Sequence, residues 1–295
     1  MSKYNERFLG VAYAVVGIFL FSAKAVLVKL AYKAEATSMH LLLFRMSFAL
    51  PFYIIITLFI TPKKKNGLTK KHYAWLLFFG LWGYYIASFL DFMGLQYIKA
   101  GLERIILFVY PTMVLILSSI FLKKNISKNQ LWAIIITYIG VFITFWGELD
   151  LQSDSLYLGA GLIFLSALTY AAYLVGSDWL IPSFGVMRFT SYAMIIACLA
   201  VISHYLLTDR SDFMIYGNEV YFYGFLMAMF CTIIPSYLVS ASIKKLGAST
   251  FAVFGSLGPF STILLAYFFL AETLSWVQVI GAVIVITGVY IANKK

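Results

Sequence analysis

Three charged side chains, Lys24, Arg45 and Asp91, stand inside long apolar stretches of this sequence. A charge at the centre of a membrane-spanning helix costs about 2.5 to 3.5 kcal/mol on insertion scales, so each should face protein or water. Lysine offers a point charge to a carboxylate or phosphate, and arginine offers a two-pronged fork. These residues predict a site for an anionic group of a small solute, or a gate of ion pairs beside it.

Two further pairs of charges extend this hypothesis. Glu103 and Arg104 open another apolar stretch on the side of the membrane nearest Lys24, so five charged groups should share the outer third of the first half. Asp178 and Arg188 occupy the corresponding positions of the second half, near the cytosolic side. We therefore expect an outer gate network and a matching inner gate. The alternative is that these side chains reach the lipid headgroups or form static pairs.

Aromatic side chains midway along the apolar stretches are candidates for the wall of a solute cavity, because they stack on a solute or donate a hydrogen bond to it. The candidates are Trp82, Tyr84, Tyr85, Tyr110, Tyr170 and Tyr237. Pro111 and Pro259 each stand about ten residues into a stretch, where a missing backbone donor favours a bend. They predict paired hinges, with ordinary packing as the alternative.

The sequence offers little for catalysis or metal binding. Cys198 and Cys231 lie in apolar stretches without metal-ligand spacing, and the three histidines lie near the ends of stretches. We expect no catalytic residues, no metal site and no cofactor. The 22 basic residues are spread over short connectors, which argues against a nucleic-acid partner.

The positions of these residues are set by the apolar stretches themselves. The chain has 62% hydrophobic and 12% charged residues and a mean hydropathy of +0.91, so it has no evident soluble domain. About 20 apolar residues of helix cross a hydrocarbon core about 30 Å thick. Ten such stretches predict an all-α membrane protein with ten transmembrane helices: 8–30, 39–61, 72–95, 102–122, 130–146, 156–180, 188–207, 220–243, 249–270 and 276–292.

The distribution of charge predicts the orientation of these spans. Fifteen of the 22 basic residues fall on one side if the N-terminus is cytosolic, and most acidic residues fall on the other. By the positive-inside rule, both termini should be cytosolic, in a bacterial cytoplasmic (inner) membrane.

The sequence also repeats itself after 148 positions. We therefore divide the chain into a first repeat, 1–147, and a second repeat, 148–295. Five spans per repeat is an odd number, so the second repeat should cross the membrane in the opposite sense to the first. The matched pairs include Ala100 and Ala248, Pro111 and Pro259, Gln130 and Gln278, and Gly140 and Gly288.

The chain resembles the EamA family of the drug/metabolite transporter superfamily over essentially its whole length. The stretches 94–117 (GLQYIKAGLERIILFVYPTMVLIL), 246–265 and 272–290 (ETLSWVQVIGAVIVITGVY) carry the resemblance, together with Arg45 and Pro51. It implies two inverted five-helix repeats around a cavity walled mainly by helices one, three, four, six, eight and nine. Lys124 departs from the family by standing where the second repeat has Glu272.

The resemblance also implies export or exchange of amino acids, their derivatives or similar metabolites without ATP. The leading hypothesis is thus an alternating-access carrier of small organic molecules, coupled to protons or to a counter-substrate. A passive channel, a membrane enzyme and a flippase for lipid-linked substrates are the alternatives. Rings of like charge would favour the channel, convergent polar groups at bilayer depth the enzyme, and lateral openings the flippase. The oligomeric state stays open.

Overall fold

The computed structural model describes residues 3–60, 68–94, 97, 103, 106–146, 156–208, 212–270 and 275–293. Every regular element among these residues is helical, so the prediction of an all-α fold is confirmed. Seven helices of the described part are long and apolar enough to cross a membrane, and the protein is an integral membrane protein. Three shorter apolar helices, Tyr110–Leu122, Lys128–Ile143 and Trp276–Ile291, fall in the expected spans four, five and ten.

The first half of the chain contains seven of the described helices. These are α1 (Lys3–Lys33), α2 (Ser38–Phe59), α3 (Lys70–Gly80), the π-helix η1 (Leu81–Ile86), α4 (Ala87–Gly94), α6 (Tyr110–Leu122) and α7 (Lys128–Phe145). The second half contains α8 (Leu156–Phe184), α9 (Val186–Thr208), the short 3-10 helix η3 (Phe213–Ile215), α10 (Asn218–Ala228), the π-helix η4 (Met229–Ile233), α11 (Ile234–Leu246), α12 (Ala248–Phe254), α13 (Leu257–Leu270) and α14 (Trp276–Asn293).

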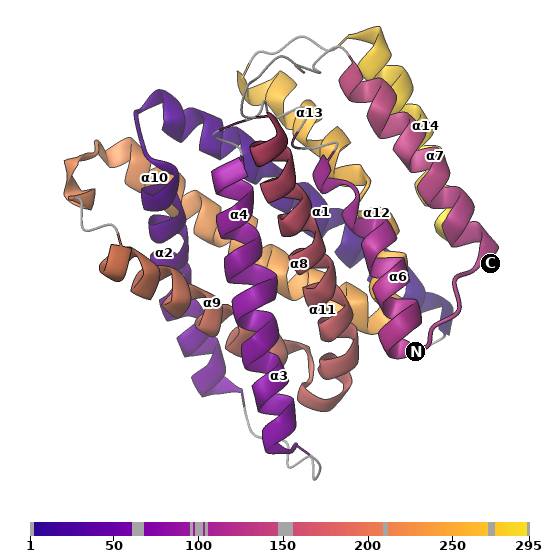
Figure 1. The fold of residues 1–295 in the computed structure, drawn as a ribbon, viewed down its shortest axis with the longest axis horizontal. Coiled ribbons are helices and arrows are strands. Elements are labelled where there is room, and N and C mark those ends of the chain that lie inside the picture. The colour runs from indigo at the N-terminus through magenta and orange to yellow at the C-terminus, as the bar shows by residue number, and fades with distance from the viewer. Residues whose placement is uncertain are drawn as a thin grey trace.

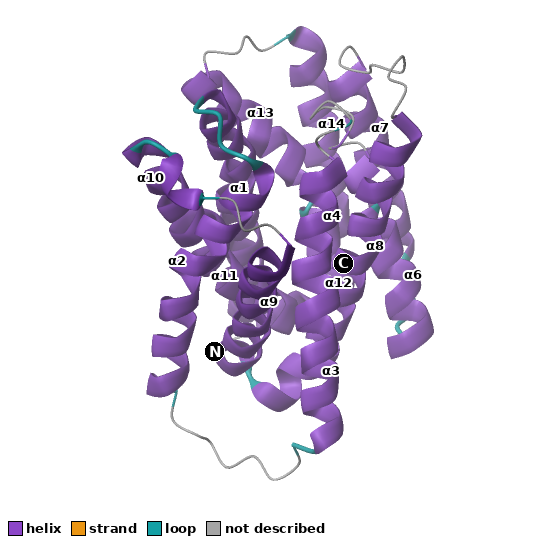
Figure 2. Ribbon diagram, turned by 60° about the vertical axis from the view of Figure 1, so that its left-hand side comes forward, coloured by secondary structure: helices purple, strands orange, loops and turns teal. Residues whose placement is uncertain are grey.

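Two views show the arrangement of these helices. The pair α7 and α14 lies side by side at one margin of the bundle, whereas α2 and α10 lie at the opposite margin (Figures 1 and 2). The helices α1, α8 and α11 run between these margins (Figure 1). Many buried side chains are small or aliphatic, such as Ala167, Ala171 and Leu174 of α8, so neighbouring helices approach closely.

The helices α7 and α14 are antiparallel. A Cβ added at Gly140 would lie 2.8 Å from the carbonyl oxygen of Gly281, and one added at Gly288 would lie 3.0 Å from that of Ala133. The residue number falls along α14 as it rises along α7, so the two helices begin at opposite ends of the bundle. Only glycine fits at both crossing points, because any side chain there would meet the backbone of the partner helix.

Corresponding local structures recur 148 positions apart. The side chains of Ser127 and Gln130 cap the start of α7 through reciprocal hydrogen bonds, and Ser275 and Gln278 do the same for α14. The π-helices η1 and η4 begin at Leu81 and Met229, again 148 positions apart. Each interrupts a spanning helix with one wider turn, a feature often found near functional sites.

Candidate functional site

A central cavity with about 110 Å³ of free volume lies among the helices of both halves. Its walls come from α1, from α4, from the segment that leads into α6, and from α8, α11, α12 and α13. These elements belong to the expected spans one, three, four, six, eight and nine, the same six that the family resemblance implied. No described residue of the margin helices α7 and α14 lines it.

A buried ion pair stands in the wall of this cavity. Lys24 of α1 places its Nζ 3.0 Å from Oδ2 of Asp91 in α4, and both side chains are almost inaccessible to solvent. Removing two charges from water is costly, and the cost is offset only where the geometry is good and further hydrogen bonds are made. The pair thus joins α1 to α4 and keeps a charged group beside the cavity.

Arg45 of α2 lies behind this pair and is only 1% exposed. Its Nη2 donates a hydrogen bond to the hydroxyl of Ser88, which also lines the cavity, at 3.2 Å. The guanidinium carbon of Arg45 and Nζ of Lys24 each lie 5.5 Å from the centre of the Phe92 ring. Within the described residues, the Nε atom of Arg45 makes no hydrogen bond. The structure therefore brings together Lys24, Arg45 and Asp91.

The structure gives less information on the other two members of the expected network, Glu103 and Arg104. Glu103 is fully buried, at 0% exposure. Arg104 lies outside the described residues. Ser88 was not singled out in the sequence, although its spacing of three residues from Asp91 puts both side chains on one face of a helix.

Two of the six aromatic candidates line the cavity. Tyr110 and Tyr170 meet edge to face with ring centroids 5.4 Å apart. The hydroxyl of Tyr110 also donates a hydrogen bond to the carbonyl of Ala252, at 3.4 Å. This contact links the start of α6 in the first half to α12 in the second half across one edge of the cavity.

Trp82 does not line the cavity and instead lies on the outer surface. Its side chain is 47% exposed and stacks on Phe78, with ring centroids 5.8 Å apart. Phe78 is itself 39% exposed. The mid-span position of Trp82 did not show the direction of its side chain around the helix axis.

The remaining three tyrosines pack between helices and do not line the cavity. Each has a partner on another helix, so each is placed to hold helices together. The pairs are Tyr84 with Tyr173 (ring centroids 5.8 Å apart), Tyr85 with His204 (5.9 Å) and Tyr237 with the hydroxyl of Ser191 (2.7 Å between oxygens).

The two expected hinge prolines follow breaks in their helices. A turn at residues 108–109 precedes α6, whose second residue is Pro111, and a turn at 255–256 precedes α13, whose third residue is Pro259. A proline in the first turn of a helix lacks an N–H that would have no partner there anyway. Each proline therefore lies in the first turn of a helix that follows a break, and the role of these breaks as hinges stays a prediction.

The two helix breaks touch each other at the cavity. A Cβ added at Gly255 would lie 1.3 Å from the hydroxyl oxygen of Tyr110. The absence of a side chain at Gly255 is thus what lets the Tyr110 ring reach Ala252. Broken helices that meet at a cavity are the usual construction of solute sites in secondary transporters.

A second charged contact closes one end of the bundle, which we call the lower end and define by Lys124, Asp178 and Lys245. Lys124 Nζ lies 2.5 Å from Oδ2 of Asp178, and the same oxygen accepts a hydrogen bond from the backbone N–H of Ala248 at 2.8 Å. Asp178 had been expected to act with Arg188. It instead joins the loop after α6 and the start of α12 to α8.

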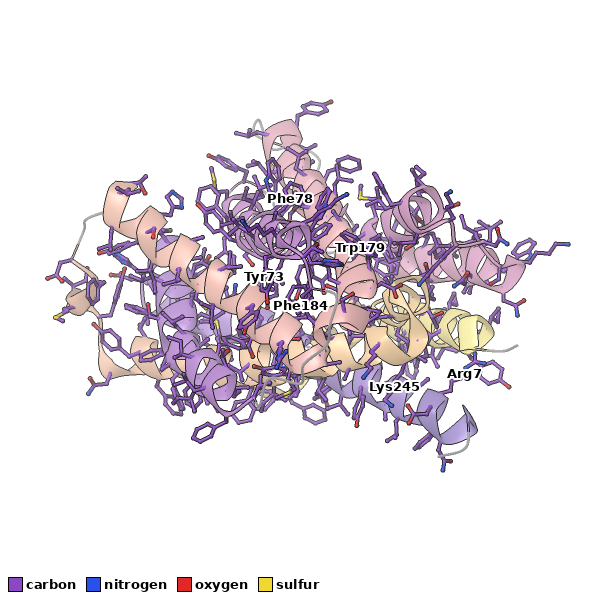
Figure 3. All side chains as sticks on the ribbon, turned by 90° about the horizontal axis from the view of Figure 1, so that it is seen from below. Arg7, Tyr73, Phe78, Trp179, Phe184 and Lys245 are labelled. Atoms are coloured by element: carbon purple, nitrogen blue, oxygen red, sulfur yellow. The ribbon has the colours of Figure 1, made fainter. Side chains whose placement is uncertain are left out.

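Two other contacts lie at this lower end. Lys245 at the end of α11 forms an ion pair with Glu6 at the start of α1, near Arg7 (Figure 3). Tyr73 of α3 and Phe184 of α8 meet edge to face, with ring centroids 5.3 Å apart (Figure 3). Helices of both halves are therefore joined at the lower end.

Comparison with known proteins identifies the family of this chain. The model of the EamA-like transporter family matches residues 8–146 and again residues 157–294. The chain is 30% identical to the uncharacterized transporter YcbK of Bacillus subtilis strain 168, over 100% of this chain and 96% of YcbK. It is 28% identical to the uncharacterized transporter YyaM of the same organism, over 84% and 82%.

A protein of known crystal structure has the same fold. It matches with a TM-score of 0.80 over 99% of both chains, at 13% sequence identity. The family predicted from the sequence is confirmed by a match that covers both halves and by relatives named as transporters. This protein is a membrane transporter that belongs to the EamA-like transporter family.

Proposed function

We propose that the protein is a secondary active carrier of small organic molecules that bear a carboxylate, such as amino acids, their derivatives or other small organic anions. The observation that carries this proposal is the position of two buried cations, Lys24 and Arg45, near Asp91, the one carboxylate among the described residues that line the cavity. Lys24 and Arg45 supply positive charge at the cavity that a solute carboxylate could contact. Charge-assisted hydrogen bonds of this kind are about twice as strong as neutral ones.

The rest of the cavity wall supports an organic solute with an apolar or aromatic body. Phe21, Phe108, Tyr170 and Phe251 contribute ring surfaces, and the hydroxyl of Ser166 is already bonded to the carbonyl of Ala87 at 2.7 Å. An inorganic ion would lose its hydration shell here without gaining enough ligands. A carboxylate attached to a carbon skeleton gains both a charged contact and apolar burial.

Alternating access between two inverted repeats is the mechanism that we propose. The family model matches each half once, and capping boxes and π-helices recur 148 positions apart. The antiparallel crossing of α7 and α14 relates Gly140 to Gly288 and Ala133 to Gly281 by the same offset. Ten spans in two inverted halves would expose the cavity to each side in turn.

The lower end would then be the cytosolic side of a bacterial inner membrane, with both termini on that side. Contacts at this end join residues that the alternation of ten spans also puts on one side, namely Glu6 with Lys245 and Lys124 with Asp178. Export or exchange would proceed when these contacts open and those at the opposite end close.

The proposal is tested by ligand binding and counterflow with the purified protein. Amino acids, organic acids and phosphate esters would be screened by thermal shift. A ligand present at 100 times its Kd stabilises the folded state by about 2.7 kcal/mol, and we expect such stabilisation from a carboxylate-bearing compound. The same compound should drive saturable counterflow in proteoliposomes. Flux that rises linearly with concentration, or stabilisation by phosphate esters alone, would contradict the proposal.

A further inference from the structure

A second hollow adjoins the central cavity on the side of the bundle that faces lipid. It has about 390 Å³ of free volume and lies between the turn before α6 and the middle of α7. The described residues that line it are Phe108, Val109, Tyr138, Ile139, Val141 and Phe142. We call it the lateral pocket.

The lateral pocket lies at the depth of the lipid tails. Tyr138 stands ten residues after Lys128, the first residue of α7. At 1.5 Å per residue this is about 15 Å along the helix, or half of a hydrocarbon core about 30 Å thick. Ile139 and Phe142 at its rim are 51% and 47% exposed, so the pocket opens toward the surroundings of the helix. A bilayer would present acyl chains at this level.

The chemistry of the lining matches an acyl chain. Five of the six described side chains in the lining are hydrocarbon, and the hydroxyl of Tyr138 is hydrogen-bonded to neighbouring groups of the protein. That hydroxyl lies 2.5 Å from Oγ1 of Thr112 and donates to the carbonyl of Val109 at 3.3 Å. The polar groups of the lining are thus bonded within the protein. A polar solute would gain no hydrogen bonds in the pocket, whereas a lipid tail would fill it without losing any.

Phe108 stands between the lateral pocket and the central cavity. Its ring lines both spaces, is 3% exposed, and meets Tyr138 on one side (centroids 5.4 Å apart) and Tyr110 on the other (6.4 Å). The backbone at Phe108 is a turn between two helical segments, so its ring can move without breaking a continuous helix.

We propose that the lateral pocket binds one acyl chain of a membrane lipid, and that Phe108 is the wall that separates this chain from the solute cavity. The bound chain packs against Phe108 and holds the break before α6 in place. Loss of the ring joins the two spaces and lets the chain enter the cavity. This binding site is separate from the solute site and does not depend on which solute is carried.

Photo-crosslinking in proteoliposomes tests the site. The probe is phosphatidylcholine with a diazirine in the middle of one acyl chain, and adducts are mapped by mass spectrometry. In the unaltered protein, adducts should concentrate on Phe108 and Tyr138. They should exceed those on Ile280 and Val283 of α14, which are 55% and 59% exposed and report ordinary lipid contact.

Two tryptophan variants provide the matched comparison. Ile139→Trp fills the lateral pocket and should lower adducts on Tyr138 at least fivefold. Ile135→Trp lies one turn earlier on α7, is 41% exposed and lies outside the lining, and should leave the adducts unchanged. Phe108→Ala should move adducts onto the cavity residues Tyr110 and Tyr170. Adducts on Phe108 and Tyr138 no more frequent than on α14, or equal in both tryptophan variants, would overturn the proposal.

Discussion

Replacing Lys24 with methionine should lower the rate of transport at least tenfold at solute concentrations below saturation. A charge-assisted hydrogen bond contributes about 1.5 to 3 kcal/mol, so its loss should weaken binding of a carboxylate-bearing solute about ten- to hundredfold. Methionine keeps most of the apolar length of lysine beside Phe21 and Phe92. The measurement is the initial rate of counterflow in proteoliposomes at several solute concentrations, together with the thermal stability of each purified variant.

Stability must be separated from transport, because the Lys24→Met change removes the cation that lies 3.0 Å from the buried carboxylate of Asp91. Breaking a buried ion pair by removing one partner costs about 3 to 5 kcal/mol. The double change Lys24→Met with Asp91→Asn removes both charges and should recover most of the stability but none of the transport. Lys71→Met, on the exposed start of α3, should change neither property. Normal counterflow by a stable double variant would remove Lys24 from the solute site.

Replacing Gly255 with alanine should both destabilise the protein and impair transport. The new methyl group would lie 1.3 Å from the hydroxyl oxygen of Tyr110, whose ring is packed against Phe108 and Tyr170. Overpacking of a filled interior costs about 1 to 3 kcal/mol. The displaced Tyr110 ring would also enter the cavity that it now lines. Thermal unfolding and counterflow rates measure the two effects.

Gly258 provides a matched control for this change. A Cβ added there would meet only the Ser22 hydroxyl at 3.7 Å and Ile18 at 3.8 Å, which are ordinary contacts. Gly258→Ala should therefore leave stability nearly unchanged. The double variant Gly255→Ala with Tyr110→Leu should regain stability, because the shorter side chain frees the space of the phenol. Equal stability of the Gly255→Ala and Gly258→Ala variants would show that the contact between the breaks is not tight.

The closeness of Lys24 and Asp91 could be predicted from the sequence. Counting residues along apolar stretches put Lys24 and Asp91 at similar levels, and in the structure they are 3.0 Å apart. The cost of isolated charges in lipid explains this success, since it forces charged groups at one depth toward each other. The family resemblance likewise indicated which six spans line the cavity. The ten-span count and the inverted orientation remain predictions.

The direction in which a side chain points around its helix axis was harder to predict from the sequence. An apolar span surrounded by lipid has no polar face, so the pattern of residues does not show which side points inward. The π-helix at Leu81–Ile86 makes the inward direction harder to predict. Its wider turn changes the angle around the helix axis of the residues that follow it. Trp82 accordingly lies on the surface, whereas Tyr110 in another span lines the cavity.

Contacts between residues from distant parts of the chain were the hardest to predict from the sequence. Asp178 pairs with Lys124, which the sequence singled out only as the counterpart of Glu272 in the second repeat. The turn before Pro111 could not be predicted from the sequence either. A proline is equally compatible with a bend in a helix and with the first turn of a new helix. The ion pair and the turn both depend on how helices of the two halves pack against each other. A local sequence pattern does not show this packing.

Cysteine labelling from each side of the membrane tests the central claim of two inverted halves most directly. Lys128→Cys and Trp276→Cys mark the first residues of α7 and α14, which are exposed and 148 positions apart. The native Cys198 and Cys231 are buried, so background labelling should be low. A membrane-impermeant maleimide should label Lys128→Cys only from the cytosolic side and Trp276→Cys only from the opposite side. Labelling of both variants from the same side would contradict the inverted architecture and the alternating-access mechanism built on it.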